Sequence, residues 1–268
     1  MVRNEPIIQV ENLTKRYNGL TAVDDISFKV KKGEIFAFLG PNGAGKTTTI
    51  KMLTTLLRPT DGEVLINGYD PLLEQSKVRD SFGIVFQDSS LDDELTAWEN
   101  MEFHGVLYQI PKNVRRKRIK GLLETVDLWG RKDDIVKTYS GGMRRRLEIA
   151  RGLLHHPKIF FLDEPTLGLD AQTRNRIWER INLLNREYET TIFFTTHYLE
   201  EAEKNATRIA IIDKGKIVAS GTAEEIEKET KTDNLEAAYL VITGKNIREQ
   251  NVSSGDSIRA KMMKRRRR

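Results

Sequence analysis

The stretch Gly40-Pro41-Asn42-Gly43-Ala44-Gly45-Lys46-Thr47-Thr48 decides the fold of this chain. It follows an uninterrupted apolar run at residues 35–39, typical of a buried parallel strand, and precedes a helical pattern at residues 49–53. The spacing matches G-x-x-x-x-G-K-[ST], which places the glycines between a strand and a helix, as in a phosphate-binding loop. We therefore predict an α/β fold in which this loop binds the phosphates of a nucleotide.

The residue types in the loop fit this chemistry. Gly40, Gly43 and Gly45 allow tight backbone turns that direct N–H groups at phosphate oxygens, and the following helix N-terminus adds positive potential. Lys46 can reach the β- and γ-phosphates, and the Thr47 hydroxyl can ligate Mg²⁺. The alternative, a glycine-rich turn followed by a chance Lys-Thr, leaves the flanking strand and helix unexplained.

Length and composition exclude several classes of protein. The chain has 268 residues, of which 38% are hydrophobic and 31% charged, which supports a globular protein with a sizeable core. The absence of Cys excludes disulfides and thiolate metal sites. No apolar stretch approaches the roughly 18 residues of a membrane-spanning helix, and residues 1–5 are polar. We expect neither a membrane span nor a signal peptide.

The net charge of +5 is concentrated at one end of the chain. Residues 245–268 contain nine Lys or Arg and two acidic residues, which is +7, so the remaining residues sum to −2. A near-neutral body does not favour nucleic-acid binding, and we expect no nucleic-acid partner. We interpret the basic tail as a solvated chain end, with attraction to an anionic membrane surface as the alternative.

Strand patterns on both sides of the loop predict two β layers. Strands at residues 7–10 and 26–30, the second alternating between apolar and polar residues, predict an antiparallel layer before the parallel core. Few strand signals lie between about residues 88 and 156, so we expect a mainly helical insertion there. Further buried strands are predicted for the core at residues 83–87, 159–164 and 191–197.

Polar side chains stand at the carboxyl ends of these three core strands. They are Gln87, the pair Asp163 and Glu164, and His197. In open α/β sheets ligands bind at this edge, so we expect all four side chains to face the nucleotide. Asp163 can hold Mg²⁺ beside Thr47, and Glu164 can polarise an attacking water. The alternative for the two carboxylates is a pair of surface acids at a strand end.

Two helix N-termini and one aromatic residue complete the candidate site. Ser140 is a plausible N-cap, and Gly141 and Gly142 leave N–H groups open, so this helix start is a second candidate phosphate cradle. A bare Ser-Gly-Gly is also common in ordinary turns. Asp170 is the expected cap of the next helix, and Tyr17 either stacks on a nucleotide base or covers the core.

Over roughly residues 6–230 the chain resembles the ATP-binding subunit of an ABC transporter. The resemblance rests on ordered motifs: an aromatic residue (Tyr17), Walker A (Gly40 to Thr48), the Q-loop (Gln87), the signature (Ser140 to Met143), Walker B with its catalytic Glu (residues 159–164), the D-loop (Asp170) and the switch His (His197). The wording Tyr139-Ser-Gly-Gly-Met-Arg-Arg-Arg is similar to the daunorubicin-resistance subfamily, which serves drug, polysaccharide and sodium efflux. The commoner signature reads Leu-Ser-Gly-Gly-Gln. Tyr139 and Met143 depart from it, but the Ser and Gly residues that contact phosphate are retained, so we expect activity.

The resemblance implies a P-loop NTPase core with an N-terminal antiparallel β layer, a helical insertion and Mg-dependent ATP hydrolysis. It implies a nucleotide-binding domain at residues 1–230, with the insertion at about 88–156, and a C-terminal extension at residues 231–268. ATP would contact Tyr17, residues 40–48, Ser140, Gly141, Gly142 and Asp170. Mg²⁺ would be held by Thr47, Gln87 and Asp163, and catalysis would use Lys46, Gln87, Glu164 and His197.

The resemblance also implies partners. Two chains would pair head to tail, so that Ser140 and Gly142 of one close on the γ-phosphate held by the other. The second chain would be an identical copy or another ABC ATPase. Transport would need a separate membrane permease, docked around residues 91–108, and export is the expected direction. The protein would then be cytoplasmic, at the inner face of the cell membrane.

Two rival functions remain open at this point. A soluble ABC ATPase acting on ribosomes or DNA is the alternative, although this chain has one cassette, no long heptad run and no Cys. A kinase or GTPase with the same phosphate loop gives no reason for Ser140-Gly141-Gly142 or His197.

Overall fold

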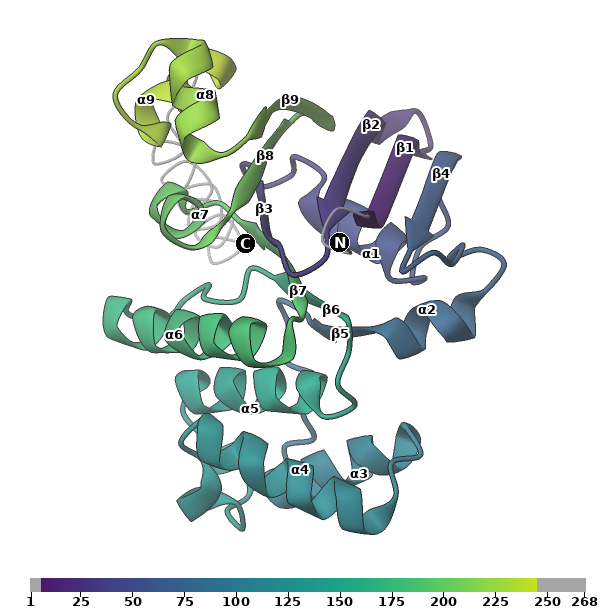
Figure 1. Cartoon of the computed structure of the whole chain (residues 1–268), viewed down its shortest axis with the longest axis vertical. Coiled ribbons are helices and arrows are strands. Elements are labelled where there is room, and N and C mark those ends of the chain that lie inside the picture. Colours follow the sequence, from purple (N-terminus) through teal and green to yellow (C-terminus); the bar gives the residue numbers. More distant parts are fainter. Residues whose placement is uncertain (1–5, 245–268) are drawn as a thin grey trace, which may run out of the picture.

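The computed structural model describes residues 6–244, which form two β-sheets with helices around the larger one (Figure 1). The larger sheet has the strand order β5-β6-β7-β3-β8-β9, and all its neighbours are parallel except β8 and β9. In that order the strands span Phe82–Val85, Ile159–Asp163, Thr191–Thr196, Ile35–Leu39, Arg208–Asp213 and Lys216–Gly221. The parallel core predicted around the phosphate loop is confirmed.

The smaller sheet is antiparallel, with the order β2-β1-β4. Its strands span Leu20–Lys31, Pro6–Tyr17 and Asp61–Ile66. In Figure 1 it lies beside the central sheet, near α1 (Lys46–Leu53). The expected N-terminal β layer is therefore present, and it includes β4, which follows the phosphate loop in sequence.

The central strands have a core on each face because successive side chains point to opposite sides. On β3, Phe36 and Phe38 pack toward the antiparallel sheet, where the ring centroids of Phe36 and Phe28 are 5.5 Å apart. Ala37 and Leu39 of the same strand belong to the other core, together with residues of the helices. Apolar residues on both faces explain why this strand has no polar alternation.

Helices cover the second face of the central sheet, and in Figure 1 helices also lie at both ends of the long axis of the molecule. Beneath the sheet lie α5 (Gly141–Leu153) and α6 (Ala171–Tyr188), while α3 (Ala97–Leu107) and α4 (Lys112–Thr125) lie at the end farthest from α8 and α9. The remaining helical elements are α2 (Gln75–Ser81), η1 (Trp129–Arg131), η2 (Val136–Thr138), α7 (Leu199–Asn205), α8 (Ala223–Thr230) and α9 (Leu235–Thr243). The chain between β5 and β6 is thus mainly helical.

The division between residues 230 and 231 stays a prediction. Helix α9 lies after it, yet Leu235, Ala238 and Tyr239 are buried in the same core cluster as the central strands. The basic tail at residues 245–268 lies outside the described residues. Among the helices of residues 6–244, none combines the length and the apolar content that a membrane crossing requires.

Candidate active site

The phosphate loop joins β3 to α1 and depends on two glycines with left-handed backbone. Gly43 has a φ of +81° and Gly45 a φ of +109°. A Cβ at Gly45 would lie 2.6 Å from the carbonyl oxygen of Ala22, on β2. Only glycine meets both demands here, so the antiparallel layer helps to fix the shape of the loop.

A cavity of about 340 Å³ opens over this loop. The loop residues that line it are Asn42, Gly43, Gly45, Lys46, Thr47 and Thr48, joined by Gln87, Glu164, Ala22 and Leu167. Within the described chain, the backbone N–H groups of Gly43, Gly45, Lys46, Thr47 and Thr48 donate to no protein acceptor. Open donors at a helix N-terminus fit the phosphates of ATP.

Lys46, Glu164 and His197 form a buried charged cluster beside the loop. The Lys46 Nζ lies 3.1 Å from Glu164 Oε1 and also donates to the carbonyl oxygens of Gly40 and Pro41, at 2.8 and 3.1 Å. The His197 Nδ1 lies 3.0 Å from Glu164 Oε2. The lysine of the phosphate loop therefore meets the strand-end side chains of Glu164 and His197 at the carboxyl edge of the sheet, as the sequence predicts.

Burial and charge act in opposite directions in this cluster. Burial lowers the pKa of Lys46, while the carboxylates of Glu164 and Asp163 act to raise it. Burial acts to raise the pKa of Glu164, but the hydrogen bond with His197 and the charge of Lys46 outweigh it and hold that pKa below its ordinary value. Glu164 is therefore ionised at neutral pH, as a group that attracts a proton from water must be.

Asp163 and Glu164 are both buried, so they are not surface acids at a strand end. The Thr195 hydroxyl donates to Asp163 Oδ1 at 2.6 Å, and the Glu164 N–H donates to the same hydroxyl oxygen at 3.0 Å. One threonine of β7 thereby fixes both carboxylate residues at the end of β6.

The residues expected to hold Mg²⁺ supply oxygen ligands of the kind that ion prefers. Thr47 and Gln87 line the cavity, and Asp163 ends β6 directly before Glu164. Residues 6–244 contain no cluster of three His, Cys, Asp or Glu able to enclose a metal. A hydroxyl, an amide and one carboxylate, completed by phosphate oxygens and water, fit a hydrated Mg²⁺ and would not form a closed protein cage.

The signature residues lie elsewhere. Ser140 caps α5 by accepting from the Met143 N–H at 3.3 Å, and Asp170 caps α6 by accepting from the Thr173 N–H at 2.9 Å. A Cβ at Gly142 would lie 2.8 Å from Thr173 Cγ2, so the starts of α5 and α6 are neighbours. None of Ser140, Gly142 and Asp170 lines the cavity over the phosphate loop.

Tyr17 ends β1 with 42% of its surface exposed, and it is not among the residues that line the cavity. The Lys15 Nζ lies 5.1 Å from its ring centroid. An exposed ring can stack on a base, so the role of Tyr17 stays a prediction.

Sequence reasoning missed three polar residues that hold this edge of the sheet. Thr195 could have been found, because it lies two residues before His197 on the same strand. Glu201 is buried and accepts from Trp178 Nε1 at 2.6 Å and from the Thr196 hydroxyl at 2.5 Å. Thr196 directly precedes His197, so Glu201 helps to hold the end of that strand. Arg145 is a buried residue inside a run of three arginines, and no sequence signal separates it from its neighbours.

The fold and this site define a P-loop ATPase of the ATP-binding-cassette type. The family model described as "ABC transporter" matches residues 23–167. "Daunorubicin resistance ATP-binding protein DrrA3" of Streptomyces coeruleorubidus is 42% identical over 229 residues, covering 85% of this chain and 72% of that relative. "Nod factor export ATP-binding protein I" of Ralstonia nicotianae is 42% identical over 225 residues, covering 84% and 70%.

A solved structure shows the same likeness. A dimeric ATP-binding cassette in a post-hydrolysis state, bound to ADP and Pi, has a TM-score of 0.73 and 30% identity, covering 80% of this chain and 98% of that one. The chain belongs to the ABC transporter ATP-binding family. It is an ATP-binding and ATP-hydrolysing transporter subunit that uses Mg²⁺. Membership of this family supports a role in transport and does not support the alternative, an ATPase that acts on ribosomes or DNA.

Proposed function

We propose that two copies of this chain, or this chain and a second ABC ATPase, close head to tail around ATP and drive a separate membrane permease. The observation that carries the proposal is the Lys46–Glu164–His197 cluster at the phosphate loop, with Ser140 on an exposed helix start outside that cavity. Each chain then supplies the loop for one ATP and the signature for the other.

Each residue of the cluster has a distinct role in this proposal. Lys46 binds the β- and γ-phosphates, Glu164 attracts a proton from the attacking water, and His197 orients Glu164 while facing the γ-phosphate. Thr47, Asp163 and Gln87 would hold Mg²⁺, which would supply positive charge to neutralise the phosphates. Because Lys46 pairs with Glu164 at 3.1 Å, binding of phosphate to Lys46 exchanges one partner for another and releases one carboxylate oxygen of Glu164.

ATP binding would then close the dimer, and hydrolysis would open it. A phosphate shared by two helix N-termini is a contact that exists only while ATP is intact, so ATP favours the closed pair. Hydrolysis removes this contact and favours opening. The alternation gives the permease two states, and export is the proposed direction because relatives are named for drug resistance and Nod factor export.

The proposed docking surface for the permease is the outer face of α3. Phe103, Val106 and Leu107 expose 62, 53 and 63% of their surface, while Ala97 and Met101 on the same helix are fully buried. In Figure 1 this helix lies at the end of the molecule, away from the antiparallel sheet. The proposed partner is therefore an apolar segment of a membrane protein.

Leu107→Asp is expected to reduce co-purification of the permease at least about tenfold, because a charge would be buried against an apolar partner. ATP hydrolysis by the isolated protein should not change, since Leu107 is exposed and does not line the ATP cavity. Quantitative mass spectrometry of protein purified from native membranes measures the effect. The matched control is Val241→Asp on α9, also 63% exposed. Equal permease recovery with both variants would contradict α3 as the docking surface.

A further inference from the structure

Arg145 is a buried arginine in the second turn of α5, five residues after the signature Ser140. Only 8% of its surface is exposed. It lines no part of the ATP cavity, and none of the roles proposed above uses it. A buried guanidinium is costly unless its charge and all its donors are compensated, so its partners indicate what it does.

The five N–H donors of a guanidinium all find acceptors here. Nε donates to the carbonyl oxygen of Pro165 at 2.6 Å, and Nη1 donates to that of Phe86 at 2.5 Å and to Glu148 Oε2 at 3.0 Å. Nη2 donates to the carbonyl oxygens of Asp163 and Glu164, at 3.2 and 2.9 Å. One side chain of the signature helix therefore binds the ends of β5 and β6 together.

Glu148 completes the arrangement one turn along α5. It is 4% exposed and neutralises the charge of Arg145, and its Oε1 accepts from the Ser90 N–H at 3.0 Å. The pair thus binds the chain on both sides of Gln87, through Phe86 and Ser90.

The contacts matter most at Glu164, whose backbone is left-handed with a φ of +48°. A non-glycine residue keeps this conformation only where its surroundings fix it. Its N–H is held by Thr195 and its carbonyl oxygen by Arg145. Its side chain, on this fixed backbone, reaches Lys46 and His197.

We infer that Arg145, charge-balanced by Glu148, is a positioning residue for ATP hydrolysis that links the signature helix to Glu164 and to the segment carrying Gln87. The inference rests on the proposed roles of Glu164 and Ser140. Glu164 acts on the ATP bound by its own chain, whereas Ser140 acts on the ATP bound by the partner. Arg145 therefore couples the start of the signature helix to Glu164 within one chain. These two sites serve two different ATP molecules, and Arg145 makes them move as one unit.

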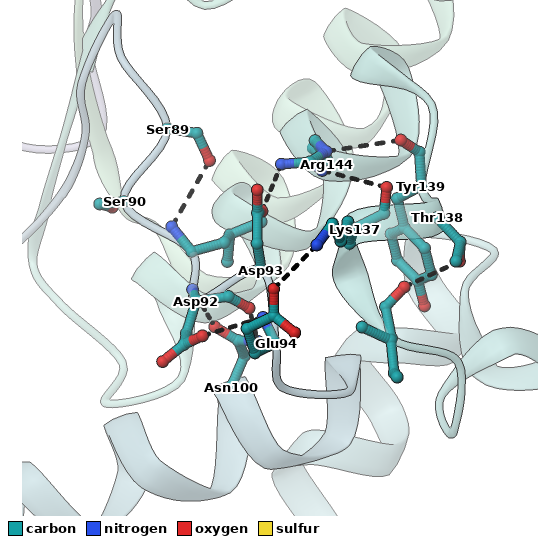
Figure 2. A network of polar contacts seen from close by, with 12 residues as sticks. Ser89, Ser90, Asp92, Asp93, Glu94, Asn100, Lys137, Thr138, Tyr139 and Arg144 are labelled. Atoms are coloured by element: carbon teal, nitrogen blue, oxygen red, sulfur yellow. Dashed lines mark hydrogen bonds and ion pairs between the residues drawn. The ribbon is translucent and has the colours of Figure 1, made fainter.

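A neighbouring network offers a contrast within the same region (Figure 2). Arg144 pairs with Asp93, which also joins the segment after Gln87 to the signature helix. Lys137 pairs with Glu94 at 3.0 Å, which joins the same segment to η2, just before that helix. Asp93, Glu94 and Lys137 are half or more exposed, and exposed pairs contribute little. Arg144 is therefore the matched control for Arg145: the same residue type, one position earlier, without a contact to β6.

The test compares Arg145→Lys with Arg144→Lys. Arg145→Lys keeps the charge that balances Glu148 but loses the planar fork, so it cannot reach all five acceptors. We expect kcat to fall about 10- to 100-fold, because a small displacement of catalytic groups is costly, while ATP affinity changes by less than about threefold. Arg144→Lys should stay within about twofold of the parent in both. An equal kcat for the two lysine variants would overturn the inference.

A double variant separates positioning from folding. Arg145→Gln leaves Glu148 buried without its charge partner, whereas Arg145→Gln/Glu148→Gln removes both charges and should recover most of the lost thermal stability. We expect the double variant to remain slow. Parental kcat in a stable double variant would reduce Arg145 to a structural residue and overturn the inference.

Measuring Glu164→Gln in parallel distinguishes failure of the proposed function from failure of the inference about Arg145. Parental hydrolysis by Glu164→Gln would overturn the proposed function and this inference with it. An inactive Glu164→Gln beside a fully active Arg145→Lys would overturn the inference alone.

Discussion

Glu164→Gln is expected to lower the rate of ATP hydrolysis by about 10²- to 10⁴-fold, the usual contribution of a positioned general base. The change keeps the size of the side chain but removes the acceptor of the water proton. It also removes the charge that pairs with Lys46 at 3.1 Å, so Lys46 is free to bind phosphate and ATP affinity should be equal or higher. Release of inorganic phosphate and a nucleotide-binding titration measure the two effects.

The same variant should accumulate an ATP-bound dimer, because the shared phosphate contact is no longer removed. Size-exclusion chromatography with light scattering, with and without ATP, measures this. Adding Ser140→Arg should abolish the dimer, since a bulky cation at the helix start blocks the contact of Ser140 and Gly142 with the partner's ATP. Glu187→Gln, at an exposed position of α6, is the control. Hydrolysis by Glu164→Gln at the parental rate would exclude Glu164 as the base.

Lys46→Ala is expected to lower the affinity for ATP about 10- to 100-fold. Lys46 is the buried cation of the phosphate loop, at 5% exposure, and a hydrogen bond to a charged group contributes roughly 1.5–3 kcal/mol. The loop should also loosen, because Lys46 donates to the carbonyl oxygens of Gly40 and Pro41. Titration with a fluorescent ATP analogue measures the affinity.

Lys51→Ala is the control for this change, because Lys51 is exposed in the last turn of the same helix. It should bind ATP like the parent. If Lys46→Ala kept parental affinity, the phosphates would not lie on this loop in the way proposed. If both variants lost affinity equally, the effect would come from α1 as a whole.

Much of this edge of the sheet could be predicted from sequence, because the rules involved are local. Apolar runs of strand length locate β3, β6 and β7, and the carboxyl ends of parallel strands share one edge. Glu164 and His197 must then come together, although 33 residues separate them in the chain. A glycine pattern followed by Lys46 needs no tertiary information either, since loop and helix start are continuous in sequence.

Contacts between a side chain and backbone atoms that are distant in sequence could not be predicted in this way. Arg144, Arg145 and Arg146 are adjacent and chemically identical, yet Arg145 is the one that reaches the carbonyl oxygens at and just after the ends of β5 and β6. The direction of each side chain depends on how α5 is rotated against the sheet. The left-handed backbone of Glu164 is equally invisible in sequence, because no glycine marks it.

The central claim, that this chain powers a separate permease, is tested most directly by affinity purification of Glu164→Gln from its native membranes in mild detergent with ATP present. Mass spectrometry then identifies the co-purifying chains. We expect a multi-span membrane protein in near-equal amount, and less of it when Leu107→Asp is added. Ribosomal or DNA-processing proteins in its place, with no membrane protein, would contradict a role in powering a permease.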